Sequence, residues 1–414
     1  MLMNVAIQND MIIHQMDVKS AYLNADIDCE VYLEQPEGYE VLSDDGEKLV
    51  YKLNKSLYGL KQSGRNWNDV LNQFLLEIGF TRSNVDPCLY FKGKDTDRII
   101  IVSWVDDLII ASTSENVLNE TKRLLKCKFK MKDLGLISCF LGVNFEHKDG
   151  VIELNQRNYV SKILERFGMT ECKPRCTPSE QKLDFSDDAQ PFESSLYRQA
   201  IGSLIYVMLC TRPDICFIVS KLSQFCEKPT TEHWTAIKHV FRYLKGTIDH
   251  KLSYCKDDTC LSLVGYTDAD WAGSCDRKST SGFCFKLSNN PLISWKSKKQ
   301  TTVALSTCEA EYVAVASAIQ EALFLKQLFE DMCDVSDVSV TLNCDNQGTI
   351  SLTKNHIVSQ RSKHIDIKYH FIRDIVSKSI VDILYVPTNC NIADVFTKTV
   401  NKYKLDSFKQ DLFG

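Results

Sequence analysis

Two adjacent aspartates, Asp106 and Asp107, lie in the middle of an otherwise apolar stretch, IIIVSWVDDLIIAS, from Ile99 to Ser112. Ionised carboxylates are costly to bury, so a solvated loop would be the simplest explanation for this pair. The flanking residues are too apolar for an ordinary loop, however, and short apolar runs of this kind are typical of strands. The sequence therefore predicts two strands that meet at a tight turn, with the two aspartates at that turn.

The composition is that of an ordinary globular protein. The chain has 414 residues, enough for about two or three domains, with 44% hydrophobic and 25% charged residues. No run of about 18 apolar residues and no signal-peptide pattern occurs, so we expect no membrane association. The 17 cysteines are scattered without a CxxC pair. This spacing favours reduced thiols over a disulfide framework or a zinc site.

The net charge of −5 gives no overall sign of nucleic-acid binding, but two short segments are basic. They are Thr121 to Lys132 and Trp295 to Gln300. A solvated amphipathic helix and a solvated loop are the simpler explanation of these two segments. They become candidates for phosphate contacts only if the neighbouring chemistry acts on nucleic acid.

The hydrophobic pattern changes along the chain. A polar, acidic segment from Ser179 to Ser195 follows two prolines and reads as a linker, and helical patterns follow it. From Leu261 three strand-like segments precede a long helical pattern from Ser306 to Phe329. A strand, a helix, a second strand and a short helix that begins at Asn391 come next. This order predicts a mixed sheet with helices packed against it.

Four carboxylates in this last third are candidates for one site. Asp268 lies in the first predicted strand and Asp345 at the carboxyl end of a later one. If the two strands pair in parallel, both side chains emerge at the same end of the sheet, where α/β proteins place their sites. On the long helix, Glu309 and Glu311 are about 200° apart around the helix axis. Glu311 shares the apolar face, so we expect it to point inward.

The fourth carboxylate, Asp394, has a structural explanation as well. Asn391 looks like a helix N-cap, and a carboxylate three residues later complements the helix dipole. Asp268 alone could be a turn former. Taken together, clustered carboxylates repel each other strongly and need cations. Oxygen ligands with room for water suit Mg²⁺, and two such ions about 3.5–4 Å apart can activate water and stabilise the leaving oxygen of a phosphodiester.

Four motifs occur in a characteristic order: YTDADWAG, STCEAEYVA, CDNQGTI and NIADVFTK. From about Leu261 to about Lys398 the chain resembles the ribonuclease H domain of copia-type retrotransposon polyproteins. The resemblance implies that Asp268, Glu311, Asp345 and Asp394 bind two Mg²⁺ ions, with Mn²⁺ as a substitute. Asp270 is then expected to support the site without ligating metal. The mobile histidine that many ribonucleases H carry before the last aspartate is absent from VPTNCNIAD.

The N-terminal part resembles a copia-type reverse transcriptase. QMDVKSAYLNADIDCEVYLEQPEGYE is similar to its first catalytic motif, SWVDDLIIAS to its hairpin motif, and KSLYGLKQSGRNWNDVL to the helix between them. The family usually has tyrosine where Trp104 stands. The resemblance implies that Asp17 and Asp106 hold two Mg²⁺ ions, with Asp107 as a less direct third member.

The same resemblance gives three further residues a role. Tyr22 matches the steric gate, an aromatic ring in the space that a ribose 2′-hydroxyl would need; a plain core tyrosine is the alternative. Gly59 and Gln62 are expected close to the nucleotide and the template backbone, although a simple helix start would also explain them.

The expected fold is a multidomain α+β and α/β chain: a reverse-transcriptase palm with a ferredoxin-like sheet and a thumb or connection region, followed by a ribonuclease H-like mixed sheet flanked by helices. The expected divisions are residues 1–178 for the palm and following segment, 179–257 for the linker and connection region, 258–400 for the ribonuclease H-like domain and 401–414 for a tail. The resemblance also implies a cytoplasmic location in virus-like particles, or a nuclear one.

The implied function is that of an RNA-directed DNA polymerase, a nucleotidyltransferase, joined to an endonuclease that cuts the RNA strand of RNA–DNA hybrids. The implied partners are hybrid, RNA template, dNTPs and other Gag/Pol products. Only 16 residues precede Asp17, so we expect the fingers subdomain to be missing and polymerisation to be impaired. Three hypotheses follow: a nuclease with weak synthesis, a polymerase that needs fingers from a longer product, and a non-catalytic, degenerate or co-opted nucleic-acid binder.

Overall fold

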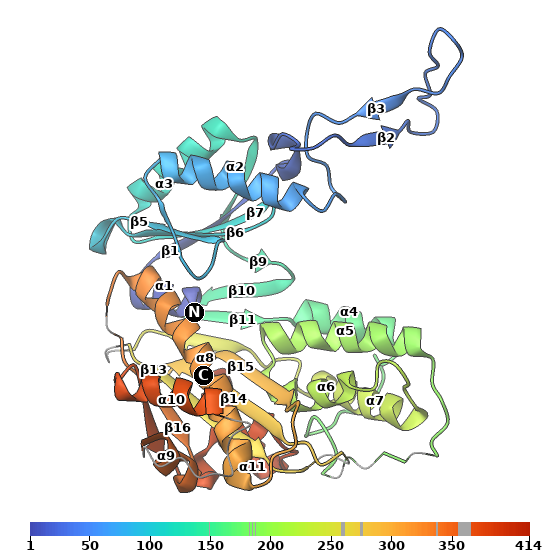
Figure 1. Cartoon of the computed structure of the whole chain (residues 1–414). Coiled ribbons are helices and arrows are strands. Elements are labelled where there is room, and N and C mark those ends of the chain that lie inside the picture. Colours follow the sequence, from blue (N-terminus) through green and yellow to red (C-terminus); the bar gives the residue numbers. More distant parts are fainter. Residues whose placement is uncertain are drawn as a thin grey trace. The chain divides into compact units, whose positions relative to one another are not determined.

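The computed structural model describes residues 1–148, 150–181, 183, 185–186, 188–257, 261–273, 276–336, 338–354 and 366–414. Two compact units divide the chain: one is Asn9–Ile137, and the other combines Met1–Gln8 with Ser138–Gly414 (Figure 1). The four domain divisions expected from the sequence stay a prediction. Within the described residues, none of the helices has the length and apolar character that crossing a membrane requires. The cysteines described are all free thiols.

The unit Asn9–Ile137 is built on a six-stranded antiparallel sheet in the order β4-β5-β6-β7-β1-β8. Its strands are β1 (Ile12–Val18), β4 (Thr81–Arg82), β5 (Leu89–Lys92), β6 (Ile99–Trp104), β7 (Asp107–Ser112) and β8 (Met131–Leu136). Two helices, α2 (Ser63–Glu77) and α3 (Glu115–Lys128), pack on the sheet, and a small ribbon pairs β2 (Tyr32–Glu34) with β3 (Val50–Lys52). Short 3-10 helices span Ala21–Asn24 and Asp95–Asp97.

The predicted hairpin is confirmed. β6 pairs with β7 from Ile99 opposite Ser112 to Trp104 opposite Asp107, which leaves only Val105 and Asp106 in the turn. Val105 has a φ of 54°, in the left-handed region that β-branched residues rarely adopt. The indole N–H of Trp67 donates to the Val105 carbonyl at 2.7 Å. This bond ties the strained turn to α2 and the hydrophobic core.

The other unit holds two sheets. The first is antiparallel, in the order β12-β11-β10-β9, with the strands β9 (Cys139–Phe140), β10 (Val143–Lys148), β11 (Val151–Asn155) and β12 (Leu252–Cys255). The helices of this region are α1 (Leu2–Gln8), α4 (Arg157–Arg166), α5 (Ser194–Cys210), α6 (Cys216–Ser223) and α7 (Thr231–Gly246), with a 3-10 helix at Pro213–Ile215. The expected linker at 179–195 has no helix or strand before α5 in its described part; positions 182, 184 and 187 lie outside it.

The second sheet has five strands in the order β15-β14-β13-β16-β17. The strands are β13 (Leu263–Asp270), β14 (Thr280–Leu287), β15 (Leu292–Lys299), β16 (Val340–Cys344) and β17 (Val381–Tyr385). The first three pair antiparallel, whereas β13–β16 and β16–β17 pair parallel. The predicted mixed sheet is therefore confirmed, as is the parallel pairing of the strands that carry Asp268 and precede Asp345.

Helices cover this mixed sheet. α8 (Thr307–Cys333) lies against β13 and β14 and extends four residues beyond the predicted end. The other elements are α9 (Gln347–Lys354), α10 (Asp366–Ser377), 3-10 helices at Thr388–Cys390 and Ile392–Phe396, α11 (Lys402–Ser407) and α12 (Lys409–Phe413). The helix expected between the last two strands is described from Asp366. Together these elements give a reverse-transcriptase-like sheet and a ribonuclease H-like sheet, the fold class expected from the sequence.

Candidate active sites

Three aspartates converge at one end of the sheet in Asn9–Ile137. Asp17 on β1 lies directly opposite Asp107 on β7, and the Val18 N–H donates to the Asp106 carbonyl at 2.7 Å. The register of three neighbouring strands thus brings the sequence-predicted carboxylates together. All three side chains are partly exposed, so the site is open to solvent.

Asp106 has a hydrogen-bond partner that the sequence analysis missed. The Tyr58 hydroxyl donates to both of its carboxylate oxygens, at 2.9 Å each. Burial raises the pKa of the Asp106 carboxyl, and the negative charges of Asp17 and Asp107 act in the same direction, whereas the Tyr58 hydrogen bond opposes them. Burial and the bond to Asp106 raise the pKa of Tyr58 to about 12. Tyr58 lies in the same motif as Gly59 and Gln62, KSLYGLKQSGRNWNDVL, and this position is the signal by which the sequence could have identified it.

The steric-gate candidate lies against the same residue. The rings of Tyr22 and Tyr58 stack with centroids 4.3 Å apart at an interplanar angle of 29°. Tyr22 packs on the edge of the core but stays partly exposed, which a plain core tyrosine would not need. An added Cβ at Gly64 would lie 3.5 Å from the Tyr22 hydroxyl, so α2 closes one side of the ring.

Gly59 and Gln62 lie on the loop between Tyr58 and α2. Gly59 has a φ of 99°, a conformation that glycine adopts without strain. Gln62 is the N-cap of α2, but its side chain donates to Cys29 Sγ at 3.2 Å instead of capping the helix. Asp107, in turn, accepts a hydrogen bond from the Gln15 amide at 3.1 Å.

A second carboxylate cluster lies at the end of the mixed sheet. The parallel ladder between β13 and β16 ends with Thr267 opposite Cys344, so Asp268 and Asp345 follow side by side. Oxygens of Asp268, Asp345 and Asp394 lie within 4.8 Å of one another. Asp268 is 3% exposed and Asp394 is fully buried.

The 3-10 helix Ile392–Phe396 carries Asp394 to this cluster. Its N-cap is Asn391, whose side-chain oxygen accepts from the Ala393 N–H at 3.1 Å and whose amide donates to the Thr267 carbonyl at 3.0 Å. Gly282, opposite Asp268, permits the close approach, because an added Cβ there would come within 2.8 Å of Phe396. Asn391 therefore caps the 3-10 helix, and the Asp394 carboxylate belongs to the cluster with Asp268 and Asp345.

The two glutamates of α8 differ as the helical wheel indicates. Glu311 is 6% exposed, and its Oε2 has no hydrogen-bond partner among the residues that the structure describes. Glu309 is partly exposed and accepts from the Leu305 N–H at 2.8 Å, while its own N–H donates to the hydroxyl of the N-cap Ser306 at 3.2 Å. Glu309 thus caps the helix, and Glu311 faces the cluster.

The electrostatics of the cluster call for cations. Burial raises the pKa of Asp268 to about 7, an effect that Lys398 opposes and Asp394 reinforces. Burial, followed by the charges of Asp268 and Asp345, raises the pKa of Glu311 to about 9. A group of buried carboxyl oxygens, one of which (Glu311 Oε2) has no hydrogen-bond partner among the described residues, suits a hard divalent ion such as Mg²⁺. The residues present therefore suit the metal that the resemblance implies.

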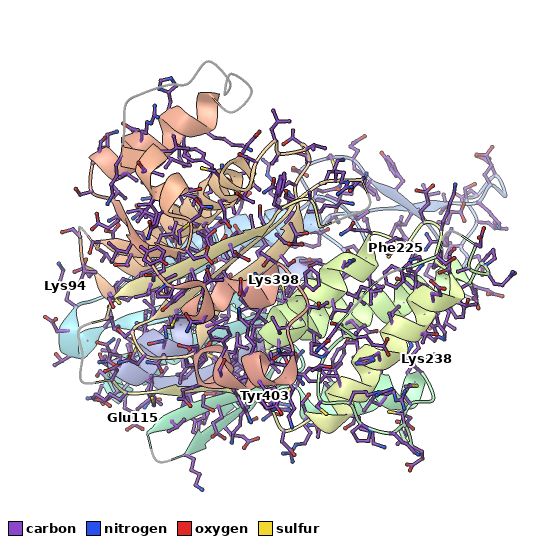
Figure 2. All side chains as sticks on the ribbon, turned by 90° about the horizontal axis from the view of Figure 1, so that it is seen from below. Lys94, Glu115, Phe225, Lys238, Lys398 and Tyr403 are labelled. Carbon is purple, nitrogen blue, oxygen red and sulfur yellow. The ribbon has the colours of Figure 1, made fainter. Side chains whose placement is uncertain are left out.

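Two lysines, missed from the sequence, supply part of this positive charge. Lys398, labelled in Figure 2, places Nζ 2.7 Å from Asp394 Oδ1 and 3.9 Å from Asp268 Oδ2. Lys404 on α11 also pairs with Asp394, and the Thr397 hydroxyl donates to Asp268. Asp270, at the end of β13, is half-buried and is not part of the cluster that could hold a metal.

The two basic segments have different surroundings. Within the first, Lys122 and Lys126 pair with Asp133, at 3.0 and 2.9 Å, so their charge is already matched. The second forms part of a hollow of about 310 Å³ beside α8, lined in part by Lys296, Lys298, Lys299 and Lys368. The second segment thus contributes several lysines to one hollow, although Lys299 pairs with Asp276 at 3.0 Å.

A family model described as "Reverse transcriptase (RNA-dependent DNA polymerase)" matches residues 1–181. The retrovirus-related Pol polyprotein from transposon TNT 1-94 of Nicotiana tabacum is 39% identical over 99% of the chain, which spans 31% of that polyprotein. A putative transposon Ty5-1 protein of Saccharomyces cerevisiae is 32% identical over 74% of the chain and is matched along its whole length.

Among solved structures, the foamy viral protease–reverse transcriptase in complex with an RNA/DNA hybrid matches 93% of the chain and 45% of its own. The TM-score is 0.50 and the identity 11%, so the likeness concerns the fold alone.

Proposed function

The chain belongs to the copia-type retrotransposon Pol polyproteins, and we propose that it cuts the RNA strand of RNA–DNA hybrids at the Asp268 cluster and carries polymerase chemistry at the Asp106 hairpin. It is thus an RNA-directed DNA polymerase and ribonuclease H type of chain. The observation that carries the nuclease proposal is the convergence of Asp268, Glu311, Asp345 and Asp394 at one sheet end. Burial of these carboxyl groups would be unfavourable without a cationic ligand.

In the nuclease site, these four carboxylates would hold two Mg²⁺ ions, which supply an activated water and charge neutralisation at the scissile phosphate. Neighbouring residues hold these carboxylates in position. The Thr397 hydroxyl orients Asp268, and Asn391 fixes the 3-10 helix that presents Asp394. Lys398 reduces the net negative charge that an incoming phosphate would meet.

The hybrid needs a cationic surface as well as a catalytic centre. The hollow lined by Lys296, Lys298 and Lys368 lies beside α8, the helix that carries Glu311. Phosphate groups are bound there through charge-assisted contacts that weaken with salt. This surface supports a hybrid as the substrate, although the net charge of the whole chain is negative.

In the polymerase site, Asp17 and Asp106 would bind the two Mg²⁺ ions around a dNTP, with an RNA template as its guide. Asp107, held by Gln15, contributes a third negative charge. Tyr22 would exclude the ribose 2′-hydroxyl, and Gly59 and Gln62 would lie near the nucleotide. From its family we also propose that the chain associates with other Gag/Pol products. We further propose a cytoplasmic, particle-associated location.

The test uses the purified chain and an end-labelled RNA annealed to DNA. We expect Mg²⁺-dependent cleavage of the RNA, a loss of at least a hundredfold in Asp345→Asn, and unchanged cleavage in Asp382→Asn. Asp382 is the matched control because it is an exposed aspartate on the adjacent strand β17. Cleavage that survives in Asp345→Asn would contradict the nuclease assignment. Hybrid binding without cleavage in the unaltered chain would favour the non-catalytic alternative.

A further inference from the structure

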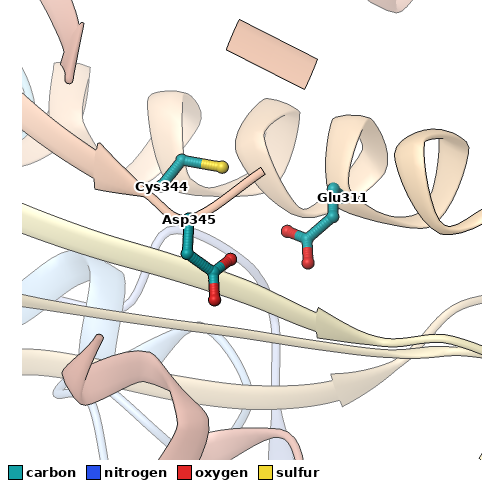
Figure 3. A group of neighbouring side chains, drawn as sticks. All are labelled: Glu311, Cys344 and Asp345. Carbon is teal, nitrogen blue, oxygen red and sulfur yellow. The ribbon is translucent and has the colours of Figure 1, made fainter. Parts of the chain in front are cut away.

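A cysteine thiol lies beside two of the nuclease carboxylates. Cys344 is the last residue of β16, directly before Asp345, and its side chain is fully buried. Its Sγ, one oxygen of Glu311 and one oxygen of Asp345 all lie within 4.8 Å of one another. Figure 3 shows the Glu311 carboxylate extending from α8 towards the strand end that carries Cys344 and Asp345.

A second observation marks this group as a place for a ligand. Glu311 is 94% buried, since its exposed fraction is 6%, yet Oε2 finds no hydrogen-bond partner in the described part of the chain. Buried polar atoms are nearly always paired, so an unpaired oxygen on a carboxylate that lies beside two other possible ligands is one that a cation would satisfy. Cys344 Sγ accepts a long hydrogen bond, 3.5 Å, from the Asn346 N–H.

The donor set also indicates which cation. Mg²⁺ takes oxygen ligands and gains nothing from sulfur, whereas Zn²⁺ and Cd²⁺ prefer a thiolate together with carboxylates. Zinc bonds of about 2.3 Å to sulfur and 2.0–2.2 Å to oxygen place ligand atoms roughly 3.5 Å apart. The three donors lie within 4.8 Å of one another, so binding would require side-chain rotations that bring them closer together.

We propose that Glu311, Cys344 and Asp345 form a binding site for Zn²⁺ or a similar thiophilic divalent ion, and that this ion inhibits hybrid cleavage. On binding, the thiol releases its proton to solvent and the sulfur electron pair forms the metal–sulfur bond. Because Glu311 and Asp345 are shared with the Mg²⁺ site, the two modes of binding exclude each other. The inhibition rests on the proposed nuclease function, but the binding does not.

The binding experiment titrates Cd²⁺ into the full chain and follows the thiolate-to-cadmium absorption in the ultraviolet. The variants are Cys344→Ala and Cys284→Ala. Cys284 is the matched control, because it is equally buried and lies on β14 of the same sheet, outside the group. We expect Cys344→Ala to lose about one equivalent of the tightest absorption change, and Cys284→Ala to titrate like the unaltered chain.

Thermal melting verifies that each variant is folded. Should Cys344→Ala fail to fold, Cys344→Ser and Glu311→Gln test the same donors and are expected to weaken the tightest Cd²⁺ site at least tenfold. Identical Cd²⁺ titrations of the unaltered chain and the folded variants would overturn the proposal.

The activity experiment measures Zn²⁺ inhibition of Mg²⁺-supported cleavage, with each variant scaled to its own uninhibited rate. We expect the Zn²⁺ concentration for half inhibition to rise at least tenfold in Cys344→Ala and to stay the same in Cys284→Ala. Equal inhibition of both variants would overturn the inhibitory role. Absence of cleavage in every sample would contradict the proposed nuclease function, while the Cd²⁺ titration would still decide the site itself.

Discussion

The Tyr58 hydroxyl is shared between both carboxylate oxygens of Asp106, at 2.9 Å from each. The same ring stacks on Tyr22. One residue thus connects the candidate metal ligand to the candidate sugar gate. Because the hydroxyl occupies the oxygens that a metal ion would use, it would compete with such an ion for Asp106.

Replacing Tyr58 with phenylalanine removes the hydroxyl and keeps the stacked ring. A hydrogen bond of this kind contributes about 0.5–1.5 kcal/mol, so we predict that Mn²⁺ binds the hairpin site roughly twofold to tenfold more tightly in Tyr58→Phe. EPR of Mn²⁺, in an Asp345→Asn background that disables the other site, measures this affinity. Tyr51→Phe is the control, since Tyr51 and Tyr58 are both 46% exposed. Weaker Mn²⁺ binding in Tyr58→Phe would show that the hydroxyl orients Asp106 for the metal instead of competing with it.

The raised pKa values in the nuclease cluster predict a pH-dependent stability. Glu311 moves from 4.5 to about 9 and Asp268 from 3.8 to about 7, so the folded chain holds more protons than the unfolded one between these limits. Without metal, the contribution of these two groups to the free energy of unfolding is therefore greatest below about pH 4. It falls as the pH rises towards 9.

Melting temperatures in EDTA across that range test the slope. We expect Glu311→Gln to decline less steeply with pH than the unaltered chain, and Glu309→Gln to decline equally. Added Mg²⁺ should flatten the curve of the unaltered chain. A slope that Glu311→Gln leaves unchanged would contradict the burial of this carboxyl group.

Substitutions of the two glutamates of α8 should also differ in their effect on hybrid cleavage. We predict that Glu311→Gln lowers hybrid cleavage at least a hundredfold, because a buried ligand oxygen is lost. Glu309→Gln alters only the helix start and should cost about 0.5–1 kcal/mol of stability. Cleavage rates at saturating Mg²⁺ and unfolding free energies measure the two effects. A larger loss of cleavage in Glu309→Gln than in Glu311→Gln would reverse the assignment.

Lys404 would compete with a metal ion for the Asp394 carboxylate. Its ammonium group pairs with a fully buried carboxylate, so a metal ion must displace or share that contact. We predict that Lys404→Gln lowers the Mg²⁺ concentration for half-maximal cleavage severalfold, most clearly at low salt. Lys402→Gln, an exposed lysine on the same helix, should leave it unchanged. An increased Mg²⁺ requirement in Lys404→Gln would mean that Lys404 supports the site.

Local patterns carried the predictions that the structure confirms. The hairpin around Asp106 follows from two apolar runs, and the inward face of Glu311 from helical periodicity. The meeting of Asp268 and Asp345 follows from a parallel pairing that the order of elements already indicates.

The residues that were missed depend on contacts between distant segments. Tyr58 reaches Asp106 across 48 positions, and Lys404 reaches Asp394 from a separate short helix. From the sequence, Cys344 is one more buried strand residue. Its proximity to Glu311 depends on where α8 packs. No periodicity or spacing in the sequence encodes these approaches.

The left-handed backbone at Val105 sets a limit on what the hairpin tolerates. Its side chain is 40% exposed, so a judgement from the surface alone would treat the position as freely replaceable. Its φ of 54° says otherwise: proline cannot adopt it, other β-branched residues do so only with strain, and glycine or asparagine would relax it. A strict restriction on sequence at this candidate metal-binding hairpin therefore falls on a residue with no chemistry of its own, because its backbone angle sets the direction in which the chain enters Asp106.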